Sequence, residues 1–202
     1  PSNVGIIGKE FCVCLTDRGQ MMAAKPLFVA LERFDQSDGD RWKNYIRWAG
    51  IPELSEVVSL DTILRPPVFP ELSDEDWQHN IHADFRLNYF HDLDYLLRRS
   101  ASVLRKNILG FYRNPERHIN SWPGLRSFSF VGYDLIEETT QISAVTNCGG
   151  FPETFSNGEL NELGLIPDFH RASEIRKLLP KNNPMEPHAK CEQYAIWRLI
   201  DG

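Results

Sequence analysis

The segment Asn147-Cys-Gly-Gly150 is the first place where residue type and spacing could support catalysis. It follows a predicted strand, and its two glycines leave backbone N–H groups open to an incoming oxyanion, as acyl transfer requires. Cys148 would be the nucleophile, and His170 or His188 would have to supply the base through space. The simpler interpretation, which we favour, is a small buried thiol at a strand end where glycines turn the chain. A non-catalytic ligand-binding loop is the third interpretation.

Three histidines between residues 79 and 91 form a second group that could bind a metal ion. His79 and His82 stand three residues apart, and two such histidines on a helix can share a metal. On a continuous helix, however, His91 would lie roughly 120° around from His79, and Arg86 would place a cation where a third ligand is needed. We therefore expect solvent-exposed histidines and no metal. The carboxylates close by in the sequence are Asp84, Asp92 and Asp94.

The segment His188-Ala-Lys-Cys191 contains the spacing of half a zinc site. A structural zinc needs four ligands, and the remaining cysteines, Cys12, Cys14 and Cys148, are distant in the sequence. The favoured interpretation is a loop histidine followed by a thiol at the start of the last strand. We expect no metal and no cofactor.

Acidic and aromatic residues are concentrated on both sides of the Pro-rich segment 65–70. Aromatic side chains can anchor a partner protein, and negative charge can steer a basic one. The alternative is a solvated acidic face over a core that contains the aromatics. The residues proposed to bind a partner are Trp42, Trp48, Phe69, Glu71, Asp74 and Trp77.

The common catalytic signatures are absent from the sequence. It contains no Walker loop, no Gly-x-Gly-x-x-Gly, no His-Glu-x-x-His, no Gly-x-Ser-x-Gly and no Cys-x-x-Cys. The commonest nucleotide-binding, zinc-protease and hydrolase interpretations are therefore excluded.

Charge and length limit the classes of partner and the compartment. The 202 residues carry a net charge of −6, so the basic field typical of nucleic-acid or anionic-membrane binding is missing, and we expect neither partner. The first eight residues hold no Lys or Arg ahead of an apolar run, and we expect a cytoplasmic protein without a signal peptide. The oligomeric state is left open.

Periodicity and turn residues predict alternating strands and helices. One helix is predicted to begin at Ser73, which has the side chain of an N-cap. Residues 85–90 fit either a helix or a strand. Strands are predicted at 10–15, 26–34, 57–61, 107–112, 127–137, 141–146 and 192–200. Helices are predicted at 42–49, from 73, at 92–106, at 159–163 and at 168–179, the last one ended by Pro180.

These elements predict an α+β fold, a single domain over residues 1–202 with a weak sub-boundary near 113–124. The sheet should be mostly antiparallel and packed by two or more helices. We expect a hairpin at 127–146 to share that sheet with strand 192–200, under helices 92–106 and 168–179.

Two hypotheses of function follow. The first is a cytoplasmic protein that acts by binding, with a regulatory, inhibitory or neutralising effect on a basic protein partner. The second is a small cysteine-dependent enzyme, of acyl-transfer or hydrolase type, centred on Cys148. A depressed thiolate pKa at Cys148 would favour the enzyme.

Overall fold

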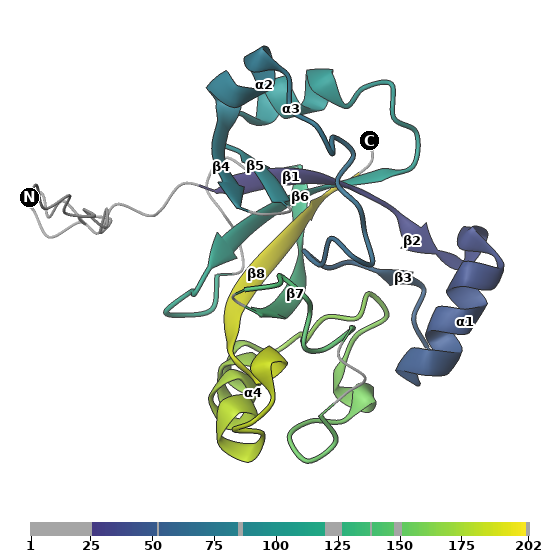
Figure 1. Cartoon of the computed structure of the whole chain (residues 1–202), viewed down its shortest axis with the longest axis vertical. Helices are drawn as coiled ribbons and strands as arrows, with labels where there is room; N and C mark the ends of the chain where they lie inside the picture. Colours follow the sequence, from purple (N-terminus) through teal and green to yellow (C-terminus); the bar gives the residue numbers. More distant parts are fainter. Residues whose placement is uncertain are drawn as a thin grey trace, which may run out of the picture.

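A six-stranded antiparallel sheet organises the chain in the computed structural model, which has an α+β architecture (Figure 1). The structure describes residues 26–51, 53–84, 87–119, 127–137, 139–147 and 151–200, with the backbone alone for residues 80–84, 87 and 88. The strand order is β4-β5-β1-β6-β8-β7. The bounds are β1 Leu27–Glu32, β4 Asn80–Asp84, β5 Leu87–Phe90, β6 Lys106–Arg113, β7 Phe128–Glu137 and β8 Cys191–Leu199.

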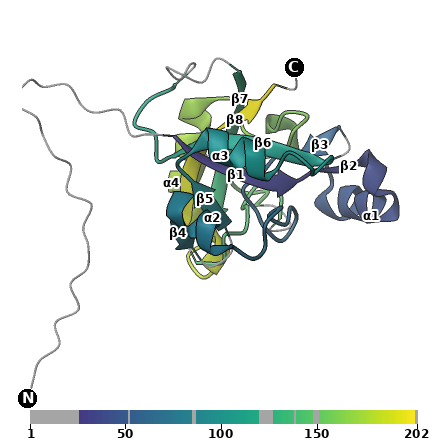
Figure 2. The ribbon, with the colours of Figure 1, turned by 90° about the horizontal axis from the view of Figure 1, so that it is seen from above.

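The helices lie around this sheet, and a two-stranded ribbon extends from it. In Figures 1 and 2, α2 and α3 lie at the β4–β5 end, α4 lies against β7 and β8, and α1 lies beyond the ribbon. The ribbon is β2 Phe34–Asp35 with β3 Glu56–Val57. The helices are α1 Asp40–Ala49, α2 Asp74–His79, α3 Leu93–Arg99 and α4 Phe169–Asn182, and the 3-10 turns are η1 Gln36–Asp38, η2 Asn157–Glu159 and η3 Pro187–Ala189.

Strand β8 is central because it pairs on both sides. It pairs with β6 from Arg113↔Tyr194 to Leu109↔Arg198, and with β7 along its whole length. The prediction that segments 127–137 and 192–200 share one antiparallel sheet is confirmed. The predicted second arm, 141–146, is not a strand, since its pairing with β7 is limited to the isolated bridge between Ile136 and Ser143 and the hydrogen bonds around it.

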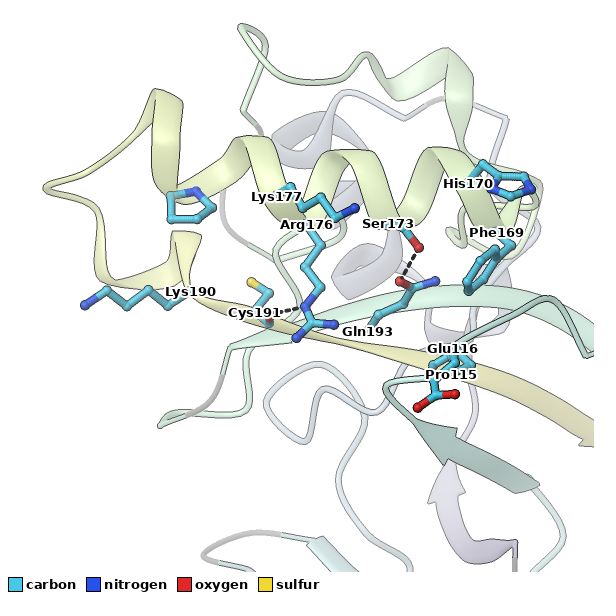
Figure 3. A pocket seen from close by; sticks show the side chains of 11 residues that line it. Pro115, Glu116, Phe169, His170, Ser173, Arg176, Lys177, Lys190, Cys191 and Gln193 are labelled. Atoms are coloured by element: carbon cyan, nitrogen blue, oxygen red, sulfur yellow. Dashed lines mark hydrogen bonds between the residues drawn. The ribbon is translucent and has the colours of Figure 1, made fainter. Parts of the chain in front are cut away.

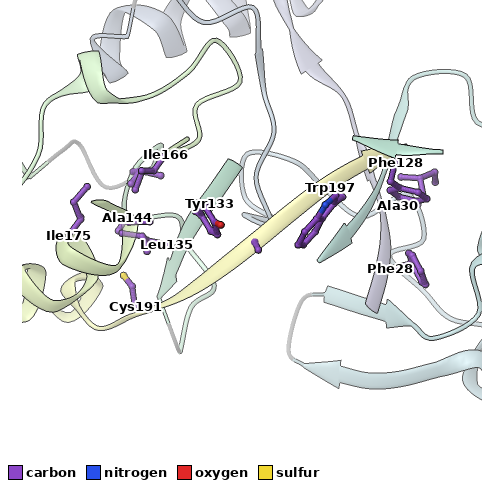
Figure 4. Close-up of a cluster of buried hydrophobic side chains, with 14 of the residues drawn as sticks. Phe28, Ala30, Phe128, Tyr133, Leu135, Ala144, Ile166, Ile175, Cys191 and Trp197 are labelled. Atoms are coloured by element: carbon purple, nitrogen blue, oxygen red, sulfur yellow. The ribbon is translucent and has the colours of Figure 1, made fainter. Parts of the chain in front are cut away.

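Both faces of the sheet are buried. Trp197 and Ala195 enter one core, which Figure 4 shows with Phe28 and Phe128, while Ile196 and Tyr194 enter the other. Alternate residues of a strand point to opposite faces, so residues 194–197 in the middle of β8 are all apolar because both faces are covered there.

The helix predicted from Ser73 ends at His79, and the open question at 85–90 is settled as strand from residue 87. Tyr89 and Phe90 are neighbours in sequence, yet Tyr89 enters one core and Phe90 the other. Neighbouring side chains of a strand point to opposite faces, so this segment follows a two-residue period and is not helical.

Other predicted boundaries shift for local reasons. The helix predicted at 92–106 ends at Arg99, where the Ser100 Oγ donates to the Leu96 carbonyl, and β6 already begins at Lys106. Pro180 lies inside α4 and does not end it; the Leu179 carbonyl accepts from Asn183, which closes the helix.

Two predicted elements are shorter in the structure, and a third falls outside the residues that the structure describes. Strand 57–61 is only Glu56–Val57, and helix 159–163 is the single turn η2. Strand 10–15 lies outside the described residues. Among the described residues, none of the helices combines the length and the apolar character that crossing a bilayer demands.

Candidate functional site

A groove of about 760 Å³ runs between α4 and the first half of β8 (Figure 3). Its size falls within the usual range for ligand sites, roughly 300–1,000 Å³. One wall is a stripe along the length of α4, and the other comes from β8 and the loop after β6. The α4 residues are Phe169, His170, Ser173, Arg176, Lys177 and Pro180; the facing residues are Pro115, Glu116, Lys190, Cys191 and Gln193.

Local sequence fixes the position and rotation of α4. Asp168 caps the helix, its carboxylate accepting from the Arg171 N–H at 2.7 Å. Ala172, Ile175 and Leu179 recur at helical spacing and are fully buried in the core. With that stripe facing the sheet, the adjacent stripe must border the groove.

Positive charge dominates the groove. Arg176, Lys177 and Lys190 line it, and none of the three forms an ion pair with a described residue. The Arg176 Nε donates to the Cys191 carbonyl at 3.1 Å, which steadies the guanidinium and leaves its terminal N–H groups for another acceptor. Glu116 supplies the carboxylate among the described lining residues.

Gln193 adds an unpaired polar group beside these cations. Its side chain is 1% exposed, and its Oε1 accepts from the Ser173 Oγ at 2.9 Å, a bond drawn in Figure 3. Its Nε2 has no partner among the described residues. Because a hydroxyl both donates and accepts, the amide could face either way, but one of its two polar atoms stays unpaired in each orientation.

The thiol that lines the groove is that of Cys191, the first residue of β8. Cys191 is 6% exposed, and its Sγ donates to the His188 carbonyl oxygen at 3.0 Å. His170 is exposed at the start of α4, where its ring lies edge-on against Phe169. Cys148 lies outside the described residues, so the structure places neither His170 nor His188 relative to it.

The six residues proposed for partner binding are distributed over three kinds of environment. Trp42 packs against Phe34 inside the molecule, and Phe69 is buried in the main core. Trp48 is 54% exposed and belongs to α1, a helix that lies apart from α2 in both Figure 1 and Figure 2.

The rest of the proposed set stays together at α2. Trp77 is 52% exposed, and Glu71 and Asp74, a few residues earlier, are exposed as well. The exposed acidic and aromatic surface is therefore smaller than the sequence suggested, because two of its aromatics are core residues.

The structure brings His79 and His91 together, contrary to the helical interpretation. The chain turns at His79, and the two rings stack with centroids 6.3 Å apart. His79 also pairs with Asp92 at 3.2 Å and stacks on Tyr95. Within the described residues, no three His, Cys, Asp or Glu side chains are grouped as a metal would require.

The sequence analysis missed the cationic groove. Arg176 and Lys177 fall on the same helical stripe as Phe169 and Ser173, a signal present in the sequence. The contribution of Lys190 and Gln193 could not be found that way, because the path of β8 decides which residues face α4. Comparisons with protein-family models, with curated proteins and with solved structures give no match for this chain.

Proposed function

We propose that this protein works by binding, and that the groove between α4 and β8 takes an anionic ligand. The observation that carries the proposal is the set of three cations, Arg176, Lys177 and Lys190, which line one groove and have no carboxylate partner among the described residues. The chain as a whole is acidic, with a net charge of −6. A confined patch of the opposite sign concentrates anions locally.

Hydrogen bonding in the groove supports binding over catalysis. The Cys191 thiol donates its proton to a backbone carbonyl, which is too weakly basic to generate a nucleophilic thiolate. The alternative enzyme centred on Cys148 stays a prediction. Alkylation of the native protein at several pH values tests it, since a catalytic Cys148 should react at low pH and a structural one should not.

Titration calorimetry with citrate and inorganic phosphate tests the binding proposal. We expect saturable binding of citrate at low ionic strength, weakened by salt because exposed charges are screened. Lys177→Glu should weaken it about tenfold by replacing attraction with repulsion. Lys43→Glu changes the net charge equally but lies on α1, so it should have little effect. If neither citrate nor phosphate binds, the proposal is refuted.

A second candidate function is supported by the exposed surface of α2. Trp77 is half exposed beside the exposed carboxylates of Glu71 and Asp74, an arrangement suited to a basic protein partner that the binding would regulate, inhibit or neutralise. A Lys-rich peptide should bind the wild-type protein and lose affinity to both Trp77→Ala and Asp74→Lys. Unchanged affinity in both variants would remove α2 from consideration.

A further inference from the structure

The groove is elongated, because it follows most of the length of α4. Its lining runs from Phe169 to Pro180, a length of about 16 Å at the helical rise of ~1.5 Å per residue. An extended peptide advances about 3.3 Å per residue, so about five residues would fill it.

Recognition in this groove must come from side chains. The backbone N–H and carbonyl of Gln193 are already paired with Asn114, and the Cys191 carbonyl is paired with Arg176. No strand ladder is therefore offered at these residues. What remains available is the guanidinium of Arg176, the two lysines and the Gln193 amide.

The two ends of the groove differ in charge. Figure 3 shows Lys190 toward the end of α4 and Lys177 in the middle, pointing toward Ser173, whereas Glu116 lies nearer Phe169, at the start of α4. An occupant with negative charge throughout would meet Glu116 at that end. A matching occupant is acidic along most of its length and uncharged beside Phe169.

We infer that the groove binds an extended acidic peptide segment of a partner protein, about five residues long, with its carboxylates at Arg176, Lys177 and Lys190. This inference rests on the proposed function and names its ligand class. A peptide backbone offers both an N–H and a carbonyl, so it can pair the free end of the Gln193 amide in either orientation, and the terminal torsion of glutamine is soft enough to turn toward it. A simple anion offers acceptors only.

Capped oligoglutamates of two to eight residues, measured by titration calorimetry, test the inference. Affinity should rise to about five residues and then level off, because longer peptides extend beyond the groove. A steady rise to eight residues would indicate unspecific charge attraction and overturn the inference. Citrate binding as tightly as pentaglutamate would overturn the peptide class and leave the proposed function standing, whereas no binding by any anion would remove both.

Oligothymidylate of five residues is the comparison for nucleic acid. Its backbone offers phosphate charge without the paired N–H and carbonyl of a peptide group, so it cannot pair the Gln193 amide in both orientations. We expect it to bind more weakly than pentaglutamate. Tighter binding by the oligonucleotide would overturn the inference.

Three variants locate the binding. Lys177→Glu should weaken pentaglutamate about fivefold to tenfold. Lys181→Glu makes the same change on the same helix at an exposed position that does not line the groove, and should change affinity by less than about twofold. Glu116→Gln should strengthen binding about twofold at low salt. Equal losses in both lysine variants would contradict binding in the groove, and circular dichroism checks that each variant is folded.

Discussion

Gly132 occupies a β-bulge in β7 where a side chain has no room. Its φ is +140°, and a Cβ there would lie 2.7 Å from the Cβ of Leu165. Gly132→Ala should lower the free energy of unfolding by about 2–3 kcal/mol, from backbone strain plus overpacking. Gly158→Ala is the control, since nothing lies closer than 4.0 Å and its φ is unremarkable. Urea denaturation of both variants measures the difference, and equal stabilities would contradict the argument.

Asp134 gives the molecule a pH-sensitive buried carboxylate. Burial raises its pKa to about 6, against opposing hydrogen bonds from Ser59, Ser143 and the Leu60 N–H, and the nearby Asp61 raises it further. A folded-state pKa above the ordinary value of 3.8 means that the associated stability is complete below about pH 4 and is lost as the pH rises through 6. We expect roughly 3 kcal/mol less stability at pH 8 than at pH 4 from this group.

Asp134→Asn separates this effect from the other titrating groups. The variant should be less stable at every pH, because an amide N–H cannot accept from the Leu60 N–H or replace both acceptor oxygens. Its unfolding free energy should nevertheless vary less between pH 5 and pH 8 than that of the wild type. A slope equal to the wild-type slope would show that Asp134 does not titrate there.

At the scale of elements, Asp76 joins α2 to α3. Its buried carboxylate accepts from the Tyr95 hydroxyl at 2.7 Å and pairs with Arg99 at 3.1 Å. Burial opposes ionisation, but the hydrogen bonds from Tyr95, Ser73 and Arg99 outweigh it and hold the pKa of Asp76 at about 2. The stability from this group is therefore present above pH 4 and is lost as the pH falls toward 2.

Removal of the carboxylate should loosen this junction. Asp76→Ala should cost roughly 2–4 kcal/mol, since a buried hydroxyl and a partly buried guanidinium lose their acceptor together. Tyr95→Phe removes one bond and should cost about 1 kcal/mol. A double-mutant cycle followed by thermal unfolding measures the coupling, and strict additivity of the two losses would contradict the direct contact.

Elements with strong local signals could be predicted from the sequence, and those decided by packing could not. Gly50, in the left-handed conformation, ends α1 directly after the predicted boundary at 49, and Asp168 caps α4 at the predicted start of its helix. The helix predicted from Ser73 could not be ended correctly, because the apolar residues at 85–90 fit both a helix and a strand. Only the two cores that receive Tyr89 and Phe90 decide between them.

In the candidate site too, some residues could be predicted from local spacing and others could not. The cations of α4 could be placed on one helical stripe from spacing alone. Lys190 and Gln193 could not be assigned to it, because η3 and the entry into β8 set their positions. Trp42 and Phe69 were wrongly predicted to lie on a binding surface. Both are core residues, and only their neighbours in sequence are charged.

At the scale of the molecule, β8 ties the last third of the chain to the rest. It pairs with β6 on one side and with β7 on the other, across the segment 113–124 where a weak sub-boundary was predicted. We expect one cooperative unfolding transition, with far-UV circular dichroism and tryptophan fluorescence giving the same urea midpoint. Two separated midpoints would indicate that residues 127–200 unfold independently.

The position of β8 also has a consequence for synthesis. Until residues 191–199 have left the ribosome, β6 and β7 each lack the neighbour that later covers one edge. Unpaired strand edges are templates for association with other chains, and pairings between distant segments form slowly. The nascent chain is therefore exposed to aggregation until β8 arrives, so translation speed and chaperone capacity should govern its yield more than the stability of the finished fold.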